Sequence, residues 1–356
     1  MLKDRRSCLD PFFEEYALTA ILFTDLRNIR FLCGFTGTEG ALLITTGHAW
    51  FLCDSRYTAQ AAEEIQCAEV RECGAVRIET IAALAVEFGL YRIGFEAAHT
   101  TVSSFRRLAE KLTDIELVEI DARLDEIRIR KDQSETGLLS EVATLSSQSL
   151  AAILSRIKPG VRELDISLAL EFEMRQRGAD GKAFDIIVAS GVRGAMPHGV
   201  ASNKIIQSGE LVTIDFGAIK NGYHSDETVT VSCGKPGLRE KEIHSIVRTA
   251  HDLAISAVKP GISCKDLDEV ARGYIRDKGY GDYFGHGLGH GVGLDIHELP
   301  TLSPRSSAAL DEGMVVTIEP GIYIPGFGGV RIEDTVVVTG NGCNVLTSAD
   351  KQLLVL

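Results

Sequence analysis

The chain is short of positive charge, has no closely spaced cysteine pair and contains no long apolar run. Its 37 Lys and Arg residues are outnumbered by 50 Asp and Glu residues, for a net charge of −13. A nucleic-acid surface needs clustered basic side chains, so we expect no nucleic-acid partner. No apolar run approaches the ~18 residues of a membrane span, so we expect no membrane partner either.

The cysteines and the N-terminus exclude several other classes. None of the eight cysteines forms a C-x-x-C pair, which excludes zinc-ribbon and thioredoxin-like sites. Residues 1–20 carry charges throughout and lack the apolar core of a signal peptide. Without a secretory signal, a disulfide framework is not expected. We therefore predict a cytoplasmic location and reduced thiols.

The composition is that of an ordinary globular protein. Of the 356 residues, 45% are apolar and 24% are charged, and the length suits about two domains. A charge-dense segment over residues 121–134 separates two differently patterned regions. We predict one domain over residues 1–125 and a second over residues 126–356.

The N-terminal region alternates short β-rich runs with helical patterns. Residues 17–57 read as a meander of strands separated by Gly and Asp or Asn turn signals. Helical patterns follow at residues 58–65, 78–88 and 103–112, with a short strand between the last two. This alternation predicts an α/β domain.

The C-terminal region contains one pattern twice. Residues 212–215 read Val-Thr-Ile-Asp, and residues 316–319 read Val-Thr-Ile-Glu. Asp226 opens Asp-Glu-Thr-Val, and Glu333 opens Glu-Asp-Thr-Val. In each copy, two helical segments joined through Lys-Pro-Gly precede the strands. The duplication predicts two halves, each with a strand pair that carries two carboxylates.

We expect these four carboxylates to meet where the halves face each other. In the first half, Asn221-Gly222 predicts a two-residue hairpin turn, which would place Asp215 and Asp226 on one face of the sheet. Diagonal neighbours on a face lie ~7–8 Å apart, close enough to hold cations ~3.5–4 Å apart. Buried like charges repel strongly, and a pair of divalent cations would compensate them.

A glycine-rich stretch adds three histidines, His286, His290 and His297. His198, in Met-Pro-His-Gly, holds roughly the place in the first half that His297 holds in the second. Imidazole can bind a transition metal or exchange a proton near neutral pH, and the pattern leaves both roles open. The glycine spacing does not match a dinucleotide-binding loop, which we exclude.

Together these motifs resemble the pita-bread metallopeptidases, which include aminopeptidase P, Xaa-Pro dipeptidase and methionine aminopeptidase. The resemblance covers essentially the whole chain, because residues 28–40 and 54–57 are similar to the creatinase-type N-terminal domain of the proline-specific members. It implies an α/β creatinase-like N-terminal domain and an α+β pita-bread catalytic domain with an internal pseudo-twofold repeat.

The resemblance also implies two divalent metal ions and favours manganese or cobalt, with zinc or iron as alternatives. The implied ligands are Asp215, Asp226, His290, Glu319 and Glu333. Asp226 and Glu333 would bridge the two ions, and each remaining ligand would bind one of them.

Further residues match the family's catalytic and substrate-binding positions. His198, His286 and His297 match its catalytic histidines that are not ligands, and Glu319 would double as the general base. Tyr323 and Arg331 match positions that line the substrate site.

The implied activity is removal of the N-terminal residue from Xaa-Pro peptides by a homodimer. A methionine aminopeptidase, a metal-free creatinase-type hydrolase and a non-catalytic peptide-binding relative are the alternatives. The family usually reads Thr-Arg-Thr after the second aspartate, whereas this chain reads Thr228-Val229-Thr230. The substitution puts an ion pair behind the ligands in doubt. Preference for dipeptides or longer peptides stays open, and we expect acceptance of both.

Overall fold

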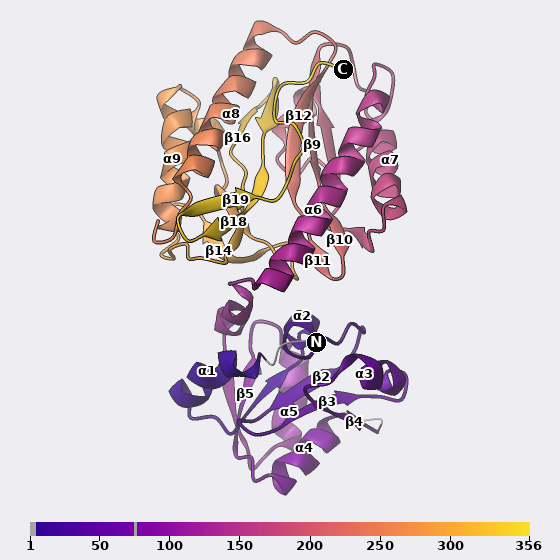
Figure 1. The fold of residues 1–356 in the computed structure, drawn as a ribbon, viewed down its shortest axis with the longest axis vertical. Helices are drawn as coiled ribbons and strands as arrows, with labels where there is room; N and C mark the ends of the chain where they lie inside the picture. Colours follow the sequence, from indigo (N-terminus) through magenta and orange to yellow (C-terminus); the bar gives the residue numbers. More distant parts are fainter. Residues whose placement is uncertain (1–4, 75–76) are drawn as a thin grey trace. The chain divides into compact units, whose positions relative to one another are not determined.

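A computed structural model describes residues 5–74 and 77–356 of the protein. The chain divides into two compact units, residues 1–128 and 129–356. The division follows a 3-10 helix, Ala122–Arg128, within the charge-dense segment in which we predicted a boundary at residue 125. Figure 1 shows the helices and strands of each unit.

The N-terminal unit is built on a six-stranded mixed sheet in the order β4-β3-β2-β1-β5-β6. The strands are β1 (Ala20–Phe23), β2 (Ala41–Ile44), β3 (Ala49–Cys53), β4 (Glu69–Glu72), β5 (Arg92–Glu96) and β6 (Glu116–Ile120). The helices are α1 (Asp10–Glu15), α2 (Leu26–Cys33), α3 (Thr58–Glu64), α4 (Arg77–Glu87) and α5 (Val102–Lys111). The predicted α/β class is confirmed.

Helix α2 corrects the prediction that residues 17–57 form strands only. Asp25 caps its first turn by accepting hydrogen bonds from the amides of Arg27 and Asn28. Gly34 ends the helix in the left-handed conformation, with φ of 83°. Both signals are present in the sequence, but eight residues between two strands were too few to show a helical period.

The C-terminal unit consists of two similar halves, as predicted. The first half contains α6 (Gln133–Ile153), α7 (Glu163–Gln176), β7 (Gly181–Lys182), β8 (Ile187–Ser190), β9 (Glu210–Phe216), β10 (Ala218–Lys220), β11 (Tyr223–His224) and β12 (Glu227–Cys233). The second contains α8 (Leu238–Ala257), α9 (Cys264–Asp277), β13 (Gly289–Gly291), β14 (Glu298–Leu302), β15 (Val315–Ile318), β16 (Gly321–Ile324), β17 (Gly328–Arg331), β18 (Asp334–Thr339) and β19 (Gly342–Val345). Strands β8, β9 and β12 form the first-half sheet, and β13, β14, β15, β18 and β19 form the second.

The predicted hairpin register is confirmed. Asp215 of β9 pairs with Thr228 of β12, and Lys220 pairs with Tyr223 beside the turn. Asn221 and Gly222 have φ of 49° and 73°, the positive values that a two-residue hairpin turn requires. This register fixes the face of the sheet to which each acid points.

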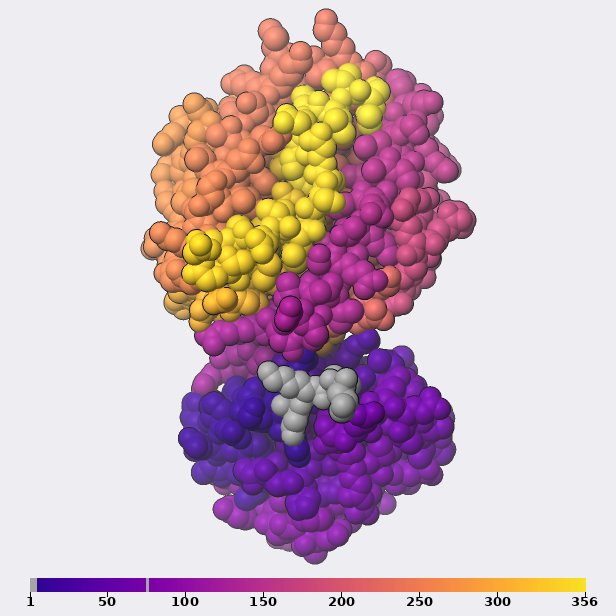
Figure 2. Space-filling view, viewed as in Figure 1, coloured from indigo at the N-terminus to yellow at the C-terminus, as the bar shows by residue number. Residues whose placement is uncertain are grey.

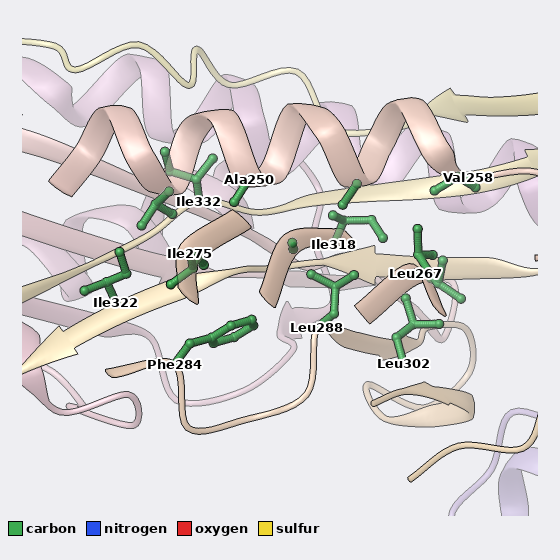
Figure 3. Close-up of a cluster of buried hydrophobic side chains, with 14 of the residues drawn as sticks. Ala250, Val258, Leu267, Ile275, Phe284, Leu288, Leu302, Ile318, Ile322 and Ile332 are labelled. Atoms are coloured by element: carbon green, nitrogen blue, oxygen red, sulfur yellow. The ribbon is translucent and has the colours of Figure 1, made fainter. Parts of the chain in front are cut away.

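Each half has its own apolar core beneath its helix pair. Helices α8 and α9 cover the second half, where Leu267, Ile275, Leu288 and Ile318 meet in one buried cluster (Figure 3). Helices α6 and α7 cover the first half, where Leu170 joins a matching cluster. The cores hold the strands rigidly, so the acids at the strand ends have fixed positions.

One segment, residues 133–156, is long and apolar enough to cross a membrane by length and composition. This qualifies our expectation that no segment approaches a membrane span. The segment is α6 with its short 3-10 extension, and half of its apolar window is buried inside the C-terminal unit. Within it, Glu135 accepts a hydrogen bond from Tyr223 and Ser147 donates one to Glu227. These are the contacts of a core helix.

Two leucines of α7 provide a matched test of this packing. Leu170 is fully buried and Leu168 is 55% exposed. We expect Leu170→Ala to lower the free energy of unfolding by about 2–5 kcal/mol, because it leaves a cavity. Leu168→Ala should change it by less than about 0.5 kcal/mol. Denaturant titration of the two variants measures both values, and equal losses would contradict the assigned core.

Candidate metal centre

Carboxylates from both halves converge at the seam between them. Oxygen atoms of Asp215, Asp226 and Glu333 all lie within 4.8 Å of one another. The halves join here because Thr228 and Glu333 are antiparallel bridge partners. Asp226 and Glu333 are buried, with 5% and 1% of their surface exposed. Three carboxylates this close form a site for a cation rather than a solvated surface.

His290 and Glu319 complete the predicted set of five. The Nε2 atom of His290 lies 3.5 Å from Glu319 Oε1 and 3.6 Å from Asp226 Oδ2. Its Nδ1 atom donates to the carbonyl of Gly291 at 3.0 Å, which leaves the Nε2 lone pair directed at the acids. Burial lowers the pKa of His290 to about 4, so the ring is neutral and can act as a ligand.

The electrostatics of the cluster call for a compensating charge. Burial, and then repulsion from neighbouring acids, raises the pKa values of Asp226 and Glu333 well above the usual range. Burial also raises the pKa of Glu319 to about 8. Among the described residues, Asp215 Oδ1 and Glu333 Oε1 have no hydrogen-bond partner. Buried, unsatisfied carboxylate oxygens beside a neutral imidazole fit divalent cations.

Arg331 is embedded in the centre rather than open to a substrate. Its Nη2 atom donates to Asp215 Oδ2 at 2.5 Å, and its Nη1 atom donates to Tyr323 Oη at 2.9 Å. Its Nε atom donates to Thr228 Oγ1 at 3.2 Å. Only 4% of the side chain is exposed. Arg331 therefore orients Asp215, which differs from the substrate-binding role that the resemblance implied.

The candidate catalytic histidines lie around these ligands. Tyr323 Oη and His286 Nε2 are 2.8 Å apart, while His286 Nδ1 donates to Gly287 O at 2.7 Å. Burial lowers the pKa of His286 to about 4 and raises that of Tyr323 to about 12. His297 stacks edge-on against His290, with ring centroids 4.4 Å apart. His297 and His198 are exposed, so both can meet a substrate.

Two threonines that sequence reasoning missed link the halves. Thr228 Oγ1 donates to Glu333 Oε2 at 2.6 Å, and Thr335 Oγ1 donates to the carbonyl of Asp226 at 2.8 Å. Each threonine lies two residues after one acid and binds the equivalent residue of the other half. The repeated acid-x-Thr pattern was a usable signal for both.

The fold and the five converging side chains define the class of protein: a two-domain, metal-dependent hydrolase of pita-bread architecture. Comparison with known proteins agrees. Residues 137–340 match metallopeptidase family M24, and residues 5–130 match the creatinase/prolidase N-terminal domain. The chain belongs to metallopeptidase family M24.

Individual relatives are similar over their whole length. The chain is 38% identical to an Xaa-Pro dipeptidase of Pyrococcus furiosus, covering 99% of this chain and 100% of that one. It superposes on an Xaa-Pro dipeptidase from Bacillus anthracis with a TM-score of 0.97 and 43% identity, over 99% of each chain. It superposes on an X-Pro aminopeptidase from Thermotoga maritima with a TM-score of 0.91 and 38% identity, over 98% of this chain and 100% of that one.

The repulsion within the cluster predicts opposite effects of Asp226→Asn on the apoprotein and the metal-bound protein. The metal-free variant should melt at a higher temperature than the wild type, because one buried repelling charge is removed. Added metal should no longer raise its melting temperature. In the wild type, a thousandfold excess over Kd would contribute about 4 kcal/mol.

Thermal melts with and without metal, together with metal analysis after dialysis, measure this. Glu333→Gln should behave in the same way. Retention of two ions by either variant would refute the bridging assignment.

Proposed function

We propose that this protein is a dinuclear-metal peptidase that removes the N-terminal residue from Xaa-Pro peptides. The proposal rests mainly on the convergence of five side chains, those of Asp215, Asp226, His290, Glu319 and Glu333. Asp215 and Glu333 each have a buried carboxylate oxygen without a hydrogen-bond partner among the described residues. The names of the Pyrococcus and Bacillus relatives support the proline specificity. The rival methionine aminopeptidases lack the N-terminal domain that this chain carries.

The five side chains would hold the two ions, which, when bound, supply Lewis-acid activation of water and of the scissile carbonyl. The set is rich in oxygen and has one imidazole, which suits manganese or cobalt, with zinc or iron as alternatives.

The chain's own residues would then move the proton and orient the substrate. Glu319 lies beside His290, and Thr317 is its only hydrogen-bond donor among the described residues, so its carboxylate is available to take a proton and return it to the leaving nitrogen. His297, which is exposed beside His290, and His286 would donate to the carbonyl oxygen as charge develops. The proline ring has a fixed φ and lacks an amide N–H. It therefore suits a pocket that has no acceptor for an amide N–H.

The proposal predicts metal-dependent cleavage of Xaa-Pro bonds. Apoprotein reconstituted with Mn²⁺ or Co²⁺ should release the first residue from an Xaa-Pro peptide but not from the matched Xaa-Ala peptide. A chelator should abolish the activity, and added metal should restore it.

Three outcomes would contradict the proposal. Absence of cleavage with Mn²⁺, Co²⁺ and Zn²⁺ would overturn it outright. Chelator-resistant activity would favour a metal-free hydrolase of the creatinase type. Preference for Met-Ala peptides would favour a methionine aminopeptidase.

A cleft of about 390 Å³ beside His286 bears on peptide length. Arg272 and Arg305 both line it. The guanidinium of Arg272 is engaged by Asp268 and by the carbonyls of Phe284 and His286. Arg305 is exposed, and within the described part of the chain it makes no hydrogen bond or ion pair. With Arg331 buried, Arg305 is the better placed cation for a dipeptide's C-terminal carboxylate.

Arg305→Ala should therefore affect short substrates more than long ones. For an Xaa-Pro dipeptide we expect KM to rise by about 10–100-fold with kcat little changed, as for loss of a charged hydrogen bond used equally in ground and transition states. For an Xaa-Pro-Yaa-Zaa peptide the change should be small. Steady-state kinetics on both substrates decide this, and equal effects would reject the assignment.

Wild-type kinetics on the same substrate pair test the mixed-length expectation. A kcat/KM ratio beyond about 100-fold, roughly 2.7 kcal/mol, would reject it. A cytoplasmic homodimer remains part of the proposal. Sedimentation analysis that finds only monomer would contradict that assembly.

A further inference from the structure

A second acidic pair lies directly behind the candidate metal centre. Glu227 follows Asp226 along the chain, and Asp334 follows Glu333. Successive residues of a strand point to opposite faces, so these two acids point away from the ligands. The side chain of Glu227 is fully buried, and that of Asp334 is 10% exposed. No motif in the sequence assigned them a role.

The two acids face each other across the seam between the halves. Glu333 N donates to Thr228 O at 3.1 Å in the antiparallel bridge that joins the halves. Continuing this register by one residue places Glu227 opposite Asp334. Like charges directly opposite on neighbouring strands repel. Without a counter-charge this pair would push apart the strand ends that carry Asp226 and Glu333.

Lys351 supplies that counter-charge. Its Nζ atom lies 2.5 Å from Glu227 Oε1 and 3.0 Å from Asp334 Oδ1, and its side chain is 7% exposed. The residue belongs to the C-terminal segment, which Figures 1 and 2 show in yellow between α8 and α6. One buried ammonium group therefore connects a strand of the first half to a strand of the second.

Neighbouring groups hold both acids in place around the lysine. Ser147 Oγ, from α6, donates to Glu227 Oε2 at 2.6 Å, and Ala349 N donates to Glu227 Oε1 at 2.9 Å. Thr347 Oγ1 donates to Asp334 Oδ1 at 2.6 Å. Asp334 Oδ2 lies 3.2 Å from His251 Nε2 of α8. Each carboxylate oxygen thus has a defined neighbour, so the geometry of the pair is specified.

Val229 brings no charge to this face of the strand. It lies on the same strand face as Glu227, where the family usually carries Arg, and it packs into the apolar core of the first half. The positive charge on this face comes instead from the C-terminal segment.

We propose that Lys351 is a positioning residue for the metal centre: by bonding Glu227 and Asp334, it sets the separation of the strand ends that carry Asp226 and Glu333. The inference rests on the proposed dinuclear centre. Residues that orient ligands from behind typically change metal affinity by about 10–100-fold when removed.

A positioning role and a purely electrostatic role of Lys351 predict opposite changes in metal affinity for Lys351→Met. Removing a positive charge beside a cation site should strengthen metal binding if only long-range electrostatics matter. Releasing the two strand ends should weaken it.

Isothermal titration of the dialysed apoprotein with Mn²⁺ measures whether the affinity rises or falls. We expect Lys351→Met to bind Mn²⁺ at least about tenfold more weakly than the wild type, and Lys351→Arg to recover part of the loss. Leu170→Ala destabilises the same unit from α7, a helix that makes none of the contacts described for Lys351, Glu227 and Asp334, and it should leave the affinity unchanged within about threefold. Wild-type or tighter binding by Lys351→Met would overturn the proposal.

A charge-matched double variant keeps the test decisive if Lys351→Met alone does not fold. Lys351→Met with Glu227→Gln retains the net charge of the cluster and an acceptor for Ser147. It should fold, because no additional unpaired charge is buried. It should still bind Mn²⁺ about tenfold more weakly, since the link between the strands is gone.

Wild-type affinity in this double variant would also overturn the role of Lys351. Failure of the wild-type protein itself to bind two ions would instead overturn the proposed function.

Discussion

The structure of the catalytic unit depends on bringing mutually repelling carboxylates together at the seam between its halves. Asp226 and Glu333 are buried there, and desolvation and repulsion from neighbouring acids both disfavour their charged forms. Rigid support is therefore needed on every side of the cluster. Thr228 and Thr335 cross the seam in opposite directions, and Arg331 holds Asp215 from one edge. Bound divalent cations would compensate the negative charge of these acids and so remove the repulsion between them.

Duplication gives the centre its symmetry, and a few side chains make its two sides different. Asp215 and Glu319 end equivalent strands, yet Asp215 receives a charged hydrogen bond from Arg331. Glu319 has His290 at 3.5 Å and a hydroxyl donor, Thr317, but no cation in contact among the described residues. An acid without a fixed cationic partner can exchange a proton more readily than one held in an ion pair. This asymmetry supports the proposed role of Glu319 of the second half as general base.

Buried ion pairs organise the glycine-rich loop that carries the histidines. Arg272 donates to the carbonyls of Phe284 and His286, while Asp268 accepts from the amide of Leu288. Lys131 pairs with Glu298 at 2.9 Å, with both side chains almost fully buried. Glycine backbones have the most conformational freedom to lose, so these contacts fix a segment that would otherwise be poorly ordered.

The sequence by itself determined the features that rest on local rules or on internal repetition. The hairpin register followed from Asn221-Gly222, because a two-residue turn leaves one pairing for the strands it joins. The acids followed from the duplication, since two copies of one motif must fold alike. Tertiary structure alone decided that Arg331 is buried against Asp215 and that Lys351 joins Glu227 to Asp334. Asp215 and Arg331 are 116 residues apart and Glu227 and Lys351 are 124 apart, so no short-range periodicity shows which long side chain reaches which acid.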